Sequence, residues 1–417
     1  MTVIDMHKER RMNGVLLLTR LAVVAALGAC CGCPAADAPE AETVQPERVP
    51  IEPFPTELGV KPLDHQALPL PEDPPVRFKK LSTIQGTAEL GLFVLVFSPD
   101  GKVLAAGRWG NEIPDVTLWD VQRRKLLHVL PHGGGIGAQI MAMAFVPPGD
   151  RLVTSCLGIN KVFLWDVRSG KLLDTLETGE KPEHVITGLA AFADGKRVIC
   201  CARNGLILWD LATKTHKTLS LEEDVPVRDS RHATDPVPCD FVAFTADGSR
   251  FATTVSHVAF APTILVWDAK TCQVTRVIPM KSGNVRFALA PDGTTVAADY
   301  YDPDLPHSYQ PVGHDVVGVW DTASGKKILA GRLFNRGVMD IAYTPDGKYL
   351  LAAGRHNIPE MGGKPVIGVW DLATGKIINT VPMPTFGPLR IAISPDNKLL
   401  AVPGLNIDIY AIEYTRK

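Results

Sequence analysis

Short apolar segments separated by turn residues recur along the chain from residue 76 to its end. Successive side chains of a β-strand point to opposite faces, so in VTLWD (116–120) Val116 and Leu118 share one face and Trp119 lies on the other. Both faces are apolar, which predicts strands of a sheet packed between two neighbouring sheets. The same pattern recurs with the pairs Val162 and Leu164, Leu206 and Leu208, Ile264 and Val266, Val317 and Val319, Ile367 and Val369, and Ile407 and Ile409.

Two turn markers alternate between these segments. The first follows an apolar stretch: FSPDG (97–101), FVPPGD (145–150), FADG (192–195), FTADG (244–248), LAPDG (289–293), YTPDG (343–347) and ISPDN (393–397). The second is a Trp-Asp pair: Trp119 and Asp120, Trp165 and Asp166, Trp209 and Asp210, Trp267 and Asp268, Trp320 and Asp321, and Trp370 and Asp371. Asp accepts local backbone N–H groups and Gly supplies positive φ, so both markers predict tight turns. A seventh copy, IDIYA, has Tyr410 in place of Trp.

This repeat resembles the WD-repeat β-propeller family, and the resemblance covers residues 76–417. It implies an all-β fold, a seven-bladed β-propeller of four-stranded antiparallel blades. The seventh unit supplies only three strands, so we expect VRFKKLSTI (76–84) to provide its missing outer strand and close the ring. The family's usual hydrogen-bonded tetrad needs a Gly-His before the first strand. That pair is missing from SGNVRFAL (282–289), RGVMDIAY (336–343) and FGPLRIAI (386–393), so we expect the blades to depend on apolar packing and turns.

The N-terminus has the features of an export signal. Residues 1–29 combine a basic start (Lys8, Arg10, Arg11) with an apolar core, Leu21–Ala29, that is far shorter than the roughly 20 residues of a membrane span. Leu27-Gly28-Ala29-Cys30 resembles the lipobox of bacterial lipoproteins, which implies lipid attachment at Cys30 and an exported protein anchored to a bacterial membrane. An ordinary secretory signal cut near Ala29 and an uncleaved anchor are alternatives, and Met12 is an alternative start.

A Pro-rich segment follows the signal. Residues 30–75 lack periodicity and are rich in Pro, Ala and Glu, which predicts an extended, disordered tether before the propeller of residues 76–417.

The repeats vary in length mainly between the second and third strands and between blades. In the family that the repeat resembles, both loop sets emerge on one face, and loops on a rigid scaffold often carry binding residues. Tolerated surface variation is the alternative. The residues that we take as interaction-face candidates are Trp109, Arg228, Arg231, Tyr300, Tyr301, Asp302, His307, His314, Arg355 and His356.

Composition excludes several functions. The 43 basic and 45 acidic residues are balanced, which argues against nucleic-acid binding. The cysteines outside the N-terminus have no zinc-ligand spacing, and three of them (Cys156, Cys200, Cys201) lie in apolar runs, so buried, inert thiols are expected. The acidic loop 299–315 matches no regular calcium loop, and we predict no metal.

We therefore expect a non-catalytic, lipid-anchored interaction scaffold that binds a protein or peptide partner on the loop-rich face. No nucleophile elbow, phosphate-binding loop or haem-attachment motif is present, so no catalysis and no cofactor are expected. A monomeric state is expected as well. The alternatives are a propeller enzyme or redox protein with its reactive groups at the axis, and a small-molecule or glycan-binding protein using the same face.

Overall fold

The computed structural model divides the chain into two units, Met1–Glu57 and Leu58–Lys417. The residues that the structure describes all belong to the second unit: 71, 73–85, 92–108, 115–133, 139–157, 159–177, 185–203, 205–219, 221, 237–255, 262–280, 286–300, 316–332, 334, 337–355, 365–382 and 390–415. In this described part there is no helix of the length and apolarity that a membrane crossing requires. The proposed boundaries at residues 29 and 75 stay predictions.

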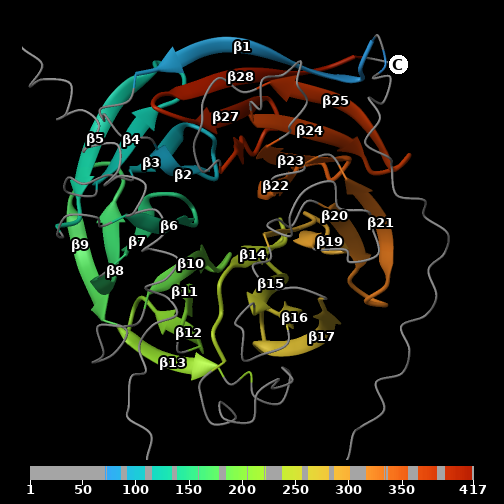
Figure 1. Cartoon of the computed structure of the whole chain (residues 1–417). Helices are drawn as coiled ribbons and strands as arrows, with labels where there is room; N and C mark the ends of the chain where they lie inside the picture. The colour runs from blue at the N-terminus through green and yellow to red at the C-terminus, as the bar shows by residue number, and fades with distance from the viewer. Residues whose placement is uncertain are drawn as a thin grey trace, which may run out of the picture. The chain divides into compact units, whose positions relative to one another are not determined.

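The second unit is a seven-bladed β-propeller of four-stranded antiparallel sheets, as the repeat predicted (Figure 1). Blade one contains β2 (Leu92–Phe97), β3 (Val103–Arg108), β4 (Asp115–Asp120) and β5 (Lys125–Pro131). Blade two contains β6 (Ile140–Val146), β7 (Arg151–Cys156), β8 (Ile159–Asp166) and β9 (Leu172–Glu177). Blade three contains β10 (Ile186–Ala191), β11 (Arg197–Ala202), β12 (Gly205–Asp210) and β13 (Thr215–Leu219).

The next three blades repeat this order from the axis outward. Blade four contains β14 (Val242–Phe244), β15 (Arg250–Val255), β16 (Thr263–Asp268) and β17 (Gln273–Pro279). Blade five contains β18 (Phe287–Leu289), β19 (Thr295–Tyr300), β20 (Val316–Asp321) and β21 (Lys327–Arg332). Blade six contains β22 (Val338–Tyr343), β23 (Tyr349–Arg355), β24 (Pro365–Asp371) and β25 (Lys376–Pro382).

The seventh blade joins the two ends of the propeller, which confirms the predicted closure. It contains β26 (Ala392–Ile393), β27 (Leu399–Pro403), β28 (Ile407–Tyr414) and, as its outer strand, β1 (Val76–Ile84). In Figure 1 the blue β1 lies along the red β28 at the rim. Asp408 accepts hydrogen bonds from Lys80 Nζ (2.8 Å) and Thr83 Oγ1 (2.7 Å), which add side-chain bonds to the ladder.

The apolar core is divided among the seven interfaces between blades. The repeated Trp residues are all buried, at most 8% exposed, and each packs between its own blade and the preceding one. Trp370 of blade six, for example, shares a cluster with Val317 and Val319 of blade five. Tyr410 occupies the equivalent place between blades six and seven. The prediction that the Trp residues pack between blades is confirmed.

The Asp that follows each Trp shapes a turn, also as predicted. Asp371 Oδ1 accepts the backbone N–H groups of Ala373 (2.9 Å) and Thr374 (3.2 Å), and Gly375 adopts φ 68°. In the equivalent turn of blade one, Arg124 takes the positive φ, at 58°. The other five Asp residues accept turn N–H groups in the same way: Asp120, Asp166, Asp210, Asp268 and Asp321.

No Gly-His pair precedes the first strand of blade two either, but a histidine there forms a hydrogen-bonded network that the sequence did not predict. His132 lies between β5 and β6, and its Nε2 is 2.5 Å from Thr154 Oγ1, which in turn accepts the indole N–H of Trp165 (2.9 Å). The sequence PHGGG (131–135) places Gly after His, so the residue order concealed the match. In blade four, Trp267 donates to Thr253 in the same way (2.9 Å), which keeps part of the network.

Candidate functional site

The long connections of the propeller emerge at one end of its strands. Because the strands of each blade are antiparallel, the connection between the second and third strands and the connection to the next blade lie at the same end of the blade. The short turns between the first and second strands and between the third and fourth strands lie at the opposite end. The longest connections, between β13 and β14 and between β19 and β20, both belong to the first set. This end is called the loop-rich face below.

Most of the predicted interaction-face residues lie outside the described residues. These are Trp109, Arg228, Arg231, Tyr301, Asp302, His307, His314 and His356; Arg355 ends β23, but its side chain is not described. Tyr300 is described and does not fit the prediction, because it is only 4% exposed. It packs edge-on against Trp320, with ring centroids 5.5 Å apart, and its hydroxyl accepts a hydrogen bond from Lys327 Nζ (3.1 Å). The alternation of side chains in β19 points Tyr300 into the sheet packing.

The innermost strands bring a different set of residues together near the loop-rich face. One residue at the start of each innermost strand pairs with a residue near the end of the second strand, as in Val94↔Gly107 and Asp340↔Ala353. In blades four and five the backbone N–H groups of Thr254 and Asp299 donate to Phe241 O (3.2 Å) and Arg286 O (3.0 Å). Phe241 and Arg286 therefore occupy the equivalent position in their blades. The seven equivalent residues are Val94, Ala142, Gly188, Phe241, Arg286, Asp340 and Arg390. We call them the axial ring.

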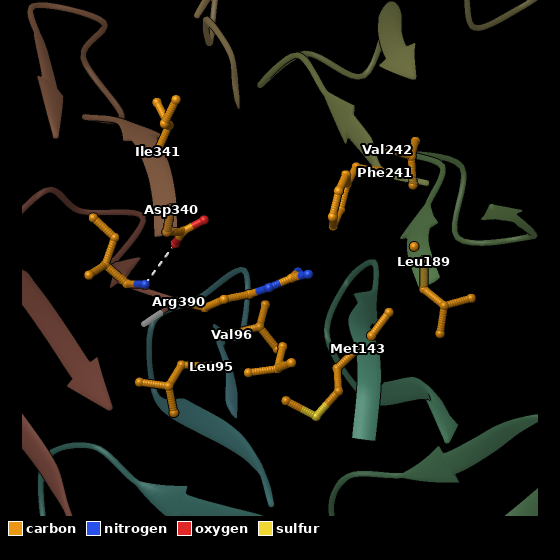
Figure 2. A pocket seen from close by; sticks show the side chains of 13 residues that line it. Leu95, Val96, Met143, Leu189, Phe241, Val242, Asp340, Ile341 and Arg390 are labelled. Atoms are coloured by element: carbon orange, nitrogen blue, oxygen red, sulfur yellow. Dashed lines mark hydrogen bonds between the residues drawn. The ribbon is translucent and has the colours of Figure 1, made fainter. Parts of the chain in front are cut away.

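All members of the axial ring except Arg286 line a cavity of about 230 Å³. Blades one to three contribute apolar side chains to it, whereas blades four, six and seven contribute Phe241, Asp340 and Arg390. Figure 2 shows Arg390 extending into the space between Asp340 and Phe241, with Met143, Leu95 and Val96 forming the apolar wall. The ring is therefore chemically asymmetric although the blades repeat.

Two guanidinium groups of the ring lie over one aromatic ring. The Cζ atoms of Arg286 and Arg390 are 4.8 and 5.2 Å from the centroid of the Phe241 ring. At such distances the ring face attracts a cation. Burial, followed by the neighbouring Arg286, lowers the pKa of Arg390 to about 10, so its guanidinium remains charged at neutral pH.

One carboxyl group of the ring is close to these cations. Asp340 Oδ2 accepts the backbone N–H of Ile391 (2.7 Å), which ties blade six to blade seven. Burial raises the pKa of Asp340 to about 6, while Arg390, the Ile391 N–H and Arg286 act in the opposite direction. Behind the ring, burial raises the pKa of Asp299 well above its usual range, although that carboxyl accepts the Arg286 backbone N–H.

This arrangement is suited to binding an anionic group. At neutral pH the ring presents two guanidinium groups against one carboxylate beside an aromatic face, and charge-assisted hydrogen bonds from Arg to a carboxylate are among the stronger polar contacts. The thirteen described residues that line the cavity include no Ser, Thr, Cys or His. Among the described residues no cluster of three potential metal ligands occurs.

Sequence reasoning did not find the axial ring. Its members are dispersed from residue 94 to residue 390, and each occupies one ordinary-looking position in or beside an apolar strand. Aligning the seven turn markers and counting back to a common strand position would have shown Phe, Arg, Asp and Arg among small residues.

Comparison with known proteins agrees with the fold. No family model matches the chain. Over 214 residues, 49% of this chain, it is 25% identical to periodic tryptophan protein 2 of Arabidopsis thaliana. Over 236 residues, 54% of this chain, it is 26% identical to autophagy-related protein 16 of the same organism. These alignments span only 20% and 38% of the two relatives' own lengths.

A solved structure is similar over most of the chain. The β-propeller domain of Cps50 (Swd1) from Myceliophteria thermophila superposes with a TM-score of 0.59 and 17% sequence identity, covering 81% of this chain and 100% of that domain. At this identity the likeness concerns the fold. Together, the curated relatives and the solved domain support the resemblance to WD-repeat β-propellers.

Proposed function

We propose that this WD-repeat-type propeller is a non-catalytic, lipid-anchored scaffold, and that its loop-rich face and axial cavity bind a protein or peptide partner carrying a carboxylate side chain. The observation that carries the proposal is the axial ring. Its Arg390 and Phe241 line a cavity of about 230 Å³, and the guanidinium groups of Arg286 and Arg390 both lie over the Phe241 ring. The cavity has room for one side chain and a wall of aliphatic groups for its stem.

The described cavity lining contains no Ser, Thr, Cys or His, and its one carboxyl group, Asp340, already accepts the backbone N–H of Ile391, which favours binding over catalysis. The curated relatives are similar through repeats of the kind that commonly present a broad face to protein partners. Loops on a rigid ring suit such a role, because the scaffold fixes their ends.

Peptide binding to the full chain tests the proposal. We expect peptides with a central Glu or Asp to bind at least roughly tenfold more tightly than matched Gln or Asn peptides, since a charge-assisted hydrogen bond contributes about 1.5–3 kcal/mol. Arg390→Gln and Phe241→Ala should remove this preference. Lys171→Ala, an exposed residue in a short turn at the opposite end, is the matched control.

Equal binding of the acidic and amide peptides would contradict the proposal, as would a preference that survives Arg390→Gln. A chain that purifies with a coloured cofactor or a catalytic metal would favour the alternative of an enzyme.

The lipid anchor is supported by the sequence around Cys30. Cells that produce the full chain should incorporate labelled fatty acid into it, and Cys30→Ser should prevent incorporation and release the protein from the membrane fraction. Cys33→Ser is the control, because that cysteine follows the lipobox-like sequence. Unchanged labelling of Cys30→Ser would exclude this site of attachment.

A further inference from the structure

Two buried cysteines from neighbouring blades meet beside the axial cavity. Cys201 lies in β11 of blade three, and Cys239 lies in the segment that leads into β14 of blade four. Both are at most 1% exposed, and their Sγ atoms are 2.7 Å apart. That separation is only about 0.7 Å longer than a covalent S–S bond of ~2.05 Å.

Backbone contacts hold the two residues at this distance. The backbone N–H of Cys239 donates to Ala202 O (3.0 Å), and Thr187 Oγ1 lies 3.3 Å from Cys239 O. Gly188 allows the close approach, since a Cβ at that position would lie 3.1 Å from Cys201 Cβ and 3.0 Å from Asp240 O. The pairing of the thiols is therefore built into the interface between the blades and does not depend on side-chain rotation alone.

We propose that Cys201 and Cys239 form a disulfide that fastens blade three to blade four when the chain folds in the presence of a disulfide oxidant. A small disulfide such as oxidised glutathione accepts the two electrons. One cysteine thiolate attacks it, forming a mixed disulfide and releasing one glutathione thiolate. The second cysteine thiolate then displaces the other glutathione, and the protons of the two protein thiols end on the two released thiols.

The neighbouring Cys200 is excluded by the alternation of the strand. Cys200 packs in the core between blades two and three, whereas Cys201 and Cys239 share the core between blades three and four. Burial, reinforced by Cys239, raises the pKa of the Cys201 thiol, so attack in the folded chain is slow. Formation is therefore expected during folding, as the interface brings the two thiols together and while the oxidant can still reach them.

The disulfide would stiffen one wall of the cavity. Cys239 precedes Phe241 by two residues, and its Sγ is 3.9 Å from Phe241 O. The inference does not depend on the proposed function, because it concerns only two thiols and the interface that joins them.

Peptide mapping tests the proposal. The full chain is refolded from denaturant with reduced and oxidised glutathione, quenched by alkylation and digested with trypsin without reduction. Trypsin places Cys200 and Cys201 in peptide 198–203 and Cys239 in peptide 232–250. We expect these peptides to be recovered as one cross-linked species in wild type and in Cys200→Ala, with the loss of two free thiols and a higher thermal midpoint than the reduced chain.

The cross-linked species should be absent from Cys201→Ala. Natively refolded wild type that yields peptide 232–250 only in alkylated form would overturn the proposal, and so would a link that persists in Cys201→Ala. If a variant fails to fold, fragment ions of the wild-type species still assign the bridge to Cys201 or Cys200. If refolding yields are low, the same map is made on folded protein held in oxidised glutathione at sub-denaturing urea, where local opening admits the oxidant. The same two outcomes then decide.

Discussion

Acidification from pH 7.5 to 5.0 is expected to destabilise the propeller through the buried histidine of blade two. His132 is 5% exposed, and its ring lies 5.0 Å from Phe163 and 5.1 Å from Trp165 between centroids. Its Nδ1 donates to Leu130 O (2.9 Å), so the neutral Nε2 accepts from the Thr154 hydroxyl, which itself accepts from Trp165. Protonation of Nε2 would convert it from an acceptor into a donor. The Thr154 hydroxyl, which is fully buried, would then lose the acceptor for its hydrogen.

The magnitude follows from the depressed pKa. Burial lowers the pKa of His132 from 6.5 to about 4, against the smaller opposing effect of the Leu130 carbonyl. A folded-state pKa below the unfolded value means that its contribution to stability is complete above pH 6.5 and is lost as the pH falls toward 4. Integrating the linkage from pH 7.5 to 5.0 gives a loss of about 2 kcal/mol in the free energy of unfolding.

Urea unfolding of the full chain at both pH values measures this loss, with His132→Gln as the matched variant. Gln retains a donor and an acceptor without titrating, and every other ionisable group is common to both proteins. The free energy of unfolding should therefore fall by about 2 kcal/mol more in wild type than in the variant. Equal pH dependence of the two proteins would refute the reasoning, as would an NMR titration in which the His132 ring gains its proton above pH 6.

Three further predictions follow from the fold and the cavity. Deletion of residues 76–84 should expose the edge of β28 and abolish cooperative unfolding in calorimetry, whereas an unaffected melt would contradict closure by β1. Cys200→Ser should raise the free energy of unfolding, measured in urea, by about 1 kcal/mol. The indole N–H of Trp209 is buried without a hydrogen-bond partner, and the Ser hydroxyl would accept from it as Thr154 accepts from Trp165, whereas Cys200→Ala should give no such gain. Binding of a Glu-containing peptide should tighten as the pH falls from 7 to 5, because Asp340, whose pKa is about 6, loses its negative charge, and titration calorimetry of Asp340→Asn should show this dependence removed.

The architecture could be predicted because every blade repeats the same short sequence patterns, each of which determines the local backbone structure. The Trp-Asp pairs and the Pro-Asp-Gly turns act within a few residues, through N–H groups accepted by Asp and positive φ at Gly, so their meaning is visible in the sequence. The missing fourth strand of the last unit could likewise be inferred, because a blade short of one strand leaves an edge that β1 fills. Repetition made each of these signals strong.

The site could not be predicted in this way, because its residues meet only through the closed ring. Arg286 and Arg390 are more than one hundred residues apart, and their approach to Phe241 depends on the register of three blades. Tyr300 shows the opposite error, a residue that the sequence assigned to the interaction face but that is buried. A loop rich in Tyr, Asp and His suggested a surface, but the first of its tyrosines still belongs to β19 and is buried. His132 was missed because Gly follows it in PHGGG (131–135) instead of preceding it, and because its partner Thr154 lies on another strand.

Comparison of two levels of the same innermost strands indicates why the axial ring is more than tolerated variation. Two residues farther along each strand, the equivalent positions are Val96, Ala144, Ala190, Ala243, Ala288, Ala342 and Ala392. Packing around the axis thus demands one small aliphatic type in all seven blades at that level. The axial ring is a single step nearer the loop-rich face on the same strands, yet it contains Phe, two Arg and an Asp in four consecutive blades. If the inner strands merely tolerated substitution, the residue types would vary at both levels. They vary only at the level nearer the loop-rich face. The requirements of the repeated fold therefore do not account for the charged residues of the axial ring, whereas selection for binding a ligand would.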